Sequence, residues 1–167
     1  LYILVTVCLL TRWLEMRPIP AKTAKEVGKA LMDIFLVRGP PLSVQSDNGK
    51  EFNNQQLKTM LNACGVQLQH GTPYRPQSQG VVERINQRIG IGLRVLESEH
   101  ISWDEDLKSI QLAINMEYHT ALKMSPFEAV HGYVLEKPCF IPEVFDRAKS
   151  IQNFKGEHWA SSLVVRM

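Results

Sequence analysis

The sequence of 167 residues is 44% hydrophobic and 22% charged, which is ordinary for one globular domain with a core of its own. Its net charge of +2 is too small to indicate a nucleic-acid or other polyanionic partner by itself. Three widely separated cysteines (Cys8, Cys64 and Cys139), with no Cys-x-x-Cys pair, argue against a disulfide framework and a zinc module and predict an intracellular protein with reduced thiols. No apolar run approaches the roughly 18 residues that a membrane span needs, so we expect no membrane association.

The first part of the chain predicts two strands and a capped helix. Residues 1–10 (LYILVTVCLL) are a continuous apolar run, typical of a strand covered on both faces, with Cys8 as a small buried side chain. Residues 12–19 alternate more and are expected to pair with that strand as a hairpin. Thr23 begins Thr-Ala-Lys-Glu, a capping-box pattern, and the helix that follows is expected to stop at Gly39.

The rest of the chain continues to alternate between strand and helix patterns. We expect, in order, a strand that ends at Asp47, a helix over 53–63, a short strand over 66–70, a loop over 71–80 (GTPYRPQSQG), a long helix from Val81, an amphipathic helix from Trp103 and a short helix within 125–132. Strands interleaved with helices predict an α/β domain. We place this domain in residues 1–145 and assign no structure to the tail, 146–167.

Two carboxylates in this arrangement are candidates for chemistry. Asp47 follows a buried strand and opens an Asn-Gly turn, where aspartate is also favoured for local backbone reasons alone. Glu83, with 35 residues between it and Asp47, lies on the polar side of a helix whose apolar face is formed by Val82, Ile85, Ile89, Leu93 and Leu96. Carboxylates that converge from different elements suit Mg²⁺, which prefers oxygen ligands. The spacing alone leaves both interpretations open.

The motifs around these carboxylates resemble the integrase catalytic core of retroviruses and gypsy-type retrotransposons. The motifs are SDNGKEF at 46–52 and TPYRPQSQGVVERIN at 72–86, and the resemblance extends over residues 2–145. It implies a ribonuclease-H-like fold, a mixed sheet with flanking helices. It further implies DNA integration by Mg²⁺- or Mn²⁺-dependent strand transfer, DNA as the partner, a homo-oligomer and a nuclear location.

The resemblance also gives roles to individual residues. Asp47 and Glu83 are implied to be the second and third members of a catalytic, metal-binding acidic triad. Contacts to DNA are implied for Asn48, Tyr74, Gln77, Ser78, Arg84 and Arg88. Arginine contacts to phosphates supply affinity rather than sequence choice. The alternative for the two arginines, that they are plain solvated helix residues, stays open.

The sequence departs from the family pattern at its beginning. The family's first triad aspartate ends a strand that precedes the first strand of this chain, and no residue here matches it. We therefore expect the sheet to lack its first, central strand, and we expect a metal site only if an aspartate lies upstream. Two functions remain open: an impaired or inactive strand transferase, and a non-catalytic DNA-binding or dimerisation module derived from a retrotransposon integrase. The upstream aspartate discriminates between them.

Overall fold

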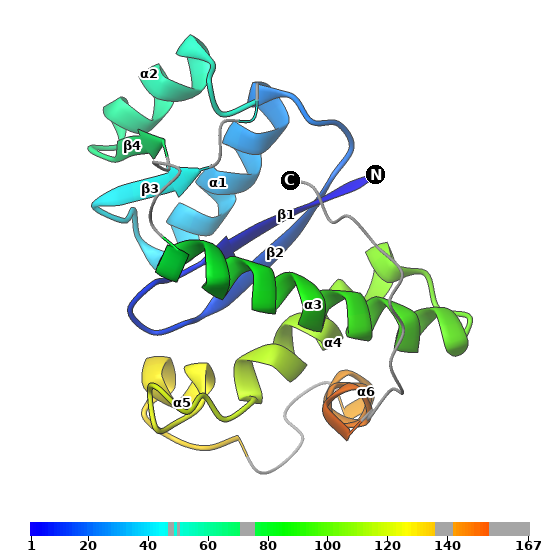
Figure 1. The fold of residues 1–167 in the computed structure, drawn as a ribbon. Coiled ribbons are helices and arrows are strands. Elements are labelled where there is room, and N and C mark those ends of the chain that lie inside the picture. Colours follow the sequence, from blue (N-terminus) through cyan, green and yellow to red (C-terminus); the bar gives the residue numbers. More distant parts are fainter. Residues whose placement is uncertain (47–48, 50, 71–75, 136–141, 154–167) are drawn as a thin grey trace. The chain divides into compact units, whose positions relative to one another are not determined.

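The computed structural model describes residues 1–46, 49, 51–70, 76–135 and 142–153 (Figure 1). The chain forms two compact units. The first contains residues 1–4 and 17–77, and the second contains residues 5–16 and 78–166. No helix in the described ranges is long and apolar enough to cross a membrane.

The chain opens with the predicted hairpin. β1 (Tyr2–Val7) pairs with β2 (Leu14–Ile19), and the turn is closed where the N–H of Cys8 donates to the carbonyl of Trp13 at 2.9 Å. Arg12 supports the reversal with a positive φ of 60°. Cys8 lies at this turn and is exposed, so the prediction of a buried cysteine is wrong. The strand ends at Val7, before the end of the apolar run, so Cys8 lies in the turn and its side chain is not packed in the core.

The first unit continues with α1 (Ala24–Arg38), β3 (Ser43–Ser46), α2 (Gln55–Ala63) and β4 (Gln67–His70). The N-cap prediction for α1 is confirmed, because the hydroxyl of Thr23 accepts the N–H of Glu26 at 3.3 Å. Gly39 ends the helix with a φ of 81°, a conformation that side chains rarely adopt.

The strands form two separate pairs rather than one sheet. β3 and β4 run parallel, with Ser43 opposite Gln67 and Ser46 opposite His70. In the described part of the chain β1 pairs with β2 alone and β3 with β4 alone. Two-stranded pieces are marginal by themselves, and the separation agrees with the expected sheet that lacks a central strand between β1 and β3.

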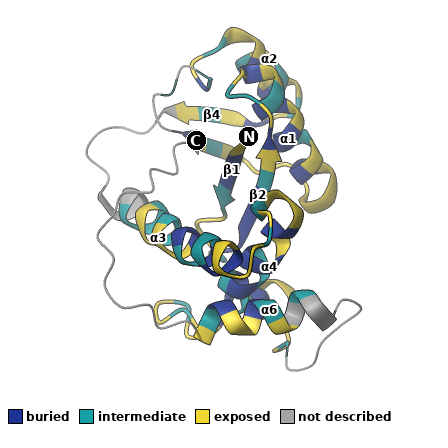
Figure 2. Cartoon of the chain, turned by 90° about the vertical axis from the view of Figure 1, so that its right-hand side faces the viewer, coloured by how far each residue is buried: buried dark blue, intermediate teal, exposed yellow. Residues whose placement is uncertain are grey.

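The core of the first unit lies between its helices and strands, and it compensates for the small sheets. α1 alternates buried and exposed residues along its length (Figure 2). Its buried face packs with the inward side chains of α2 and of the strands, and Gly28 leaves room for the sulfur of Met60. The buried residues of this core are Leu4, Ile19, Ala24, Val27, Ala30, Leu31, Ile34, Phe35, Phe52, Leu57, Leu61 and Val66.

The second unit is mainly helical. It contains α3 (Pro76–Ser98), α4 (Trp103–Met116), α5 (Pro126–His131) and α6 (Pro142–Asn153). α6 covers the start of the tail to which the sequence analysis assigned no structure. Its Ala148 and Ile151 are buried, and it packs on α4. Two apolar residues three positions apart are a weak sequence signal for a helix, and the helix is stabilised mainly by its packing on α4.

Side chains of α4 cover the outer backbone edge of β2. Asn115, which is 1% exposed, accepts the N–H of Leu14 at 2.8 Å and donates to its carbonyl at 2.9 Å. Gln111 accepts the N–H of Met16 at 2.8 Å. The helix thus satisfies backbone groups that a neighbouring strand would otherwise pair, which protects an edge from unwanted association.

Arg147 joins α6 to α4 through charge. Its guanidinium pairs with the carboxylate of Asp106, which is buried, and with that of Glu99 at 3.3 Å. Asp106 also accepts the hydroxyl of Ser109 at 2.6 Å. The hydrogen bond to Asp106 raises the pKa of the Arg147 guanidinium above its usual value. A buried carboxylate is therefore fully paired, as buried charge requires.

Candidate active site and nucleic-acid interface

The strand that leads to Asp47 is present. β3 ends at Ser46, which is buried and paired in register with β4. Asp47 and Asn48 come directly after it in the sequence and lie outside the described residues, as does Tyr74. The other three residues of β3 are exposed or half-buried, so the expectation of a buried strand before Asp47 is wrong. The position of Asp47 itself stays a prediction.

Glu83 lies on the exposed side of α3, as its place opposite the apolar stripe predicts. Ile89 and Leu96, both members of that stripe, are fully buried. The carboxylate of Glu83 forms no hydrogen bond or ion pair with any residue that the structure describes. A carboxylate that is exposed, unpaired and carried by a rigid helix is available to a ligand.

The helix that carries Glu83 begins earlier than expected. α3 starts at Pro76 rather than near Val81, so Gln77 and Ser78 belong to its first turn and not to a loop. Proline is well tolerated there because the first helical N–H has no partner within the helix to lose. The polar composition of 71–80 concealed this start.

The two arginines assigned to DNA differ in their partners. The Nε of Arg84 donates to the carbonyl of Gly80 on the preceding turn at 3.0 Å, and the side chain is exposed. Arg88 forms an ion pair with Glu117, the residue directly after α4. Sequence reasoning did not identify Glu117, since 29 positions separate it from Arg88 and no local pattern relates them.

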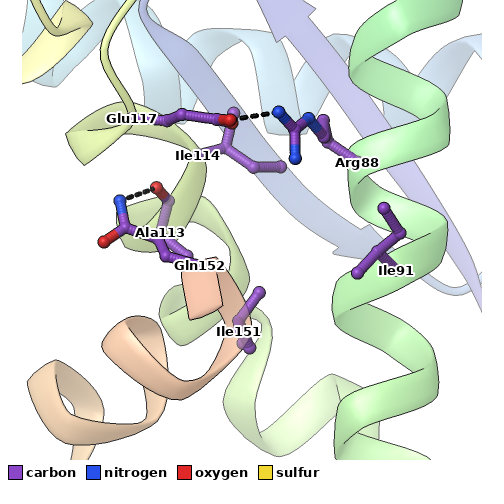
Figure 3. Close-up of a pocket in the computed structure, with 7 residues that line it drawn as sticks. All are labelled: Arg88, Ile91, Ala113, Ile114, Glu117, Ile151 and Gln152. Atoms are coloured by element: carbon purple, nitrogen blue, oxygen red, sulfur yellow. Dashed lines mark hydrogen bonds and ion pairs between the residues drawn. The ribbon is translucent and has the colours of Figure 1, made fainter. Parts of the chain in front are cut away.

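Arg88 and Glu117 lie on the rim of a small pocket among three helices (Figure 3). Its walls are mostly apolar: Ile91 from α3, Ala113 and Ile114 from α4, and Ile151 with Gln152 from α6. Gln152 donates to the carbonyl of Ala113 at 2.8 Å, so α6 satisfies a carbonyl near the C-terminal end of α4 that has no partner within that helix.

The donor set for a metal is limited in the described part of the chain. No group of three or more His, Cys, Asp or Glu side chains comes together there in a way that could hold an ion. Glu83 by itself fits one place in such a site, because its carboxylate is free and oxygen donors suit Mg²⁺ and Mn²⁺. Any further ligands would lie outside these ranges, and Asp47 as one of them stays a prediction.

Comparison with known proteins agrees with the motifs. Residues 1–76 match the family described as the integrase core domain. The catalytic core domain of BIV integrase is similar in structure, with a TM-score of 0.66 and 27% sequence identity over 75% of this chain and 82% of that one. A chain of the simian T-cell lymphotropic virus intasome, solved in complex with PP2A regulatory subunit B56 gamma, gives a TM-score of 0.69 at 19% identity over 81% of this chain and 50% of that one. The fold is thus that of the integrase catalytic cores, which is ribonuclease-H-like.

The curated relatives include transposon polyproteins and a human protein. The Tf2-3 transposon polyprotein of Schizosaccharomyces pombe is 32% identical over 70% of this chain. KRAB-A domain-containing protein 2 of Homo sapiens is 32% identical over 74% of it. The chain spans 9% of the first relative and 26% of the second. It is an integrase core of the retroviral and retrotransposon type.

Proposed function

We propose that this integrase core binds DNA along α3 and, together with an aspartate supplied upstream, transfers DNA strands with Mg²⁺ or Mn²⁺. The observation that supports this most is Glu83, an exposed and unpaired carboxylate on a long helix, in a chain similar in sequence and fold to integrase cores. Asp47 would supply a second carboxylate from the end of β3. A metal bound there would supply charge stabilisation to the attacking and leaving oxygens of phosphoryl transfer.

The rest of the proposed site holds the DNA. Arg84 and Arg88, one helical turn apart on α3, contact phosphates. The remaining contacts are assigned to Asn48, Tyr74, Gln77 and Ser78. DNA as the partner places the protein in the nucleus, and an assembly of several copies would supply more of the phosphate contacts that set affinity.

The catalytic part of this proposal is tested by Glu83→Gln in the full-length natural protein. The substitution keeps the shape of the side chain and removes its charge, so strand transfer should fall by about a hundredfold or more while DNA affinity changes little. Glu97→Gln is the matched control, because Glu97 is also exposed on α3. If Glu83→Gln and the control are equally active, Glu83 is not a metal ligand.

The binding part is tested by Arg84→Ala and Arg88→Ala, each measured by fluorescence anisotropy with a labelled duplex at several salt concentrations. Each lost phosphate contact should weaken binding and reduce the slope of log K against log salt by about 0.9. Lys108→Ala, which removes one exposed charge from α4, is the control. Slopes equal to that of the control would remove both arginines from the interface.

A second candidate, a DNA-binding or dimerisation module without catalysis, is favoured by the acids that precede Asp47. Glu15 is buried and occupied, because it accepts from the indole of Trp13 at 2.8 Å and from Gln111 at 3.2 Å. Asp33 is an exposed residue of α1. Glu26, the third acid before Asp47, lies in the first turn of α1. None of the three is a free carboxylate at a strand end, so a catalytic site would need its first ligand from upstream of Leu1. Sequencing the transcript upstream of Leu1 decides between the two: an aspartate that ends a strand-like run supports catalysis, and any other residue there supports the module.

A further inference from the structure

Arg88 and Glu117 form a bridge between two helices at the surface. The guanidinium extends from α3 and the carboxylate comes from the residue directly after α4, as Figure 3 shows. The two side chains are 51% and 37% exposed, so water and ions in solution reach the pair. The pair is a surface ion pair, a class whose contribution is typically small and easily displaced.

Glu117 is held where Arg88 can reach it. Its N–H donates to the carbonyl of Ile114 at 3.2 Å, which fixes its backbone to the last turn of α4. That end of the helix is anchored to β2 by the two hydrogen bonds of Asn115 and to α6 by Gln152. The carboxylate is thus carried by a fixed backbone rather than by a free loop.

The electrostatics of α4 also favour a cation at this place. A helix C-terminus carries a partial negative charge, and a carboxylate beside it is unfavourable. The last turn of α4 contains no basic residue of its own, so in the described structure Arg88 supplies the positive charge from α3. Glu117 and the end of α4 together form an anionic partner for one guanidinium.

We propose that Glu117 competes with DNA phosphate for Arg88 and thereby lowers the affinity of the core for DNA. This rests on the proposed function, since it takes Arg88 as a phosphate contact. A carboxylate and a phosphate bind the same guanidinium donors through the same kind of charge-assisted hydrogen bonds, so one side chain cannot serve both fully. Glu117 is therefore a positioning residue that sets how much of the positive charge of α3 is available.

The test is Glu117→Gln, which keeps the size of the side chain and removes its charge. Glu105→Gln is the matched control, because Glu105 is an exposed acid at the other end of α4 from Glu117 and pairs with no residue in the described ranges. DNA affinity is measured by fluorescence anisotropy on a short duplex across a series of salt concentrations. Glu117→Gln should tighten binding about two- to fivefold, the range that a surface ion pair can withhold, and steepen the salt dependence by up to about 0.9. The control should change both much less.

The same two substitutions in an Arg88→Ala background separate the competition from general charge effects. There Glu117→Gln should behave like Glu105→Gln, because the guanidinium for which Glu117 competes is gone. The inference is overturned alone if Arg88→Ala weakens binding but Glu117→Gln matches its control, or if its effect persists without Arg88. The proposed role of Arg88 itself fails, and the inference with it, if Arg88→Ala binds DNA as tightly as the natural protein.

Discussion

Gly92 allows α3 and α4 to approach closely, and adding one methyl group there tests that packing. A Cβ at Gly92 would lie 2.7 Å from Cγ2, 2.9 Å from Cγ1 and 3.1 Å from Cδ1 of Ile110. Carbon atoms pack best at about 3.5–4.0 Å, so all three contacts are too short. Ile110 is fully buried and β-branched, and it has little freedom to turn away. We expect Gly92→Ala to force the helices apart.

The magnitude follows from two opposing effects. Overpacking a core by a methyl group costs about 1–3 kcal/mol. Replacing glycine by alanine inside a helix returns roughly 1 kcal/mol. The net loss in the free energy of unfolding for Gly92→Ala is therefore between zero and about 2 kcal/mol.

Gly90 provides the matched control on the same helix. A Cβ at Gly90 meets no atom within 4 Å, so Gly90→Ala should gain roughly 1 kcal/mol from helix propensity alone. The propensity gain is common to both variants, and their difference of about 1–3 kcal/mol measures the contact with Ile110. For a chain of this size each kcal/mol shifts Tm by about 2–4 °C, so Gly92→Ala should melt about 2–12 °C below Gly90→Ala.

Thermal unfolding followed by circular dichroism checks this difference. In an Ile110→Ala background the penalty at Gly92 should disappear, because the three close atoms are removed, and the two substitutions should be strongly non-additive. If Gly92→Ala is as stabilising as Gly90→Ala, the close approach of α3 and α4 is refuted. If the penalty persists without Ile110, its cause lies elsewhere in the helix.

Three further predictions concern single groups. Arg147→Ala should lower the free energy of unfolding by about 2–4 kcal/mol, because it leaves the buried carboxylate of Asp106 with no cation; this loss is smaller than the loss expected for a fully buried pair. Adding Asp106→Asn to the same chain should recover part of the loss, and urea unfolding measures both effects. Asn115→Ala should cost about 2–4 kcal/mol, since both backbone groups of Leu14 lose their partner, and hydrogen exchange at the Leu14 amide should accelerate. Partial desolvation raises the pKa of the Cys8 thiol, which is exposed but not fully hydrated, and hydrogen bonds from the hairpin turn and a nearby arginine offset this and bring the pKa below its ordinary value. The thiolate therefore forms at a lower pH in the folded protein than in the unfolded chain, so iodoacetamide should modify Cys8 faster in the folded protein than in the denatured one. Equal rates in the two states would contradict the lowered pKa. Because the folded pKa is the lower one, this group stabilises the fold above the unfolded pKa and ceases to do so as pH falls through the folded value.

Local signals in the sequence were sufficient for the individual elements. The hydroxyl of Thr23 and the glycine at 39 begin and end α1 as predicted, because capping and a positive φ depend on residues only a few positions apart. The stripe that includes Ile89 and Leu96 predicts the buried face of α3 and, by exclusion, the exposure of Glu83. The family motifs were equally local, and the comparisons confirm the integrase core to which they point.

The start of α3 and the helix α6 were not predicted, because their local sequence signals are weak. The polar residues from Pro76 onward are typical of a loop, although proline is also common at the first position of a helix, which is the position Pro76 occupies in α3. α6 has a short apolar stripe that becomes informative only when α4 is present to bury it.

The sequence by itself therefore determined most of the helices and strands, all but α6 and the start of α3, and the class of protein, since each of these depends on the periodicity and spacing of neighbouring residues. Only the tertiary structure decided which distant side chains meet. Asn115 pairs with Leu14 across 101 positions, and Arg88 with Glu117 across 29. The role of Gly92 likewise depends on Ile110 of another helix. Such contacts follow from the packing of whole helices and strands, and the side-chain pattern along one element does not predict which residues of another element will contact it.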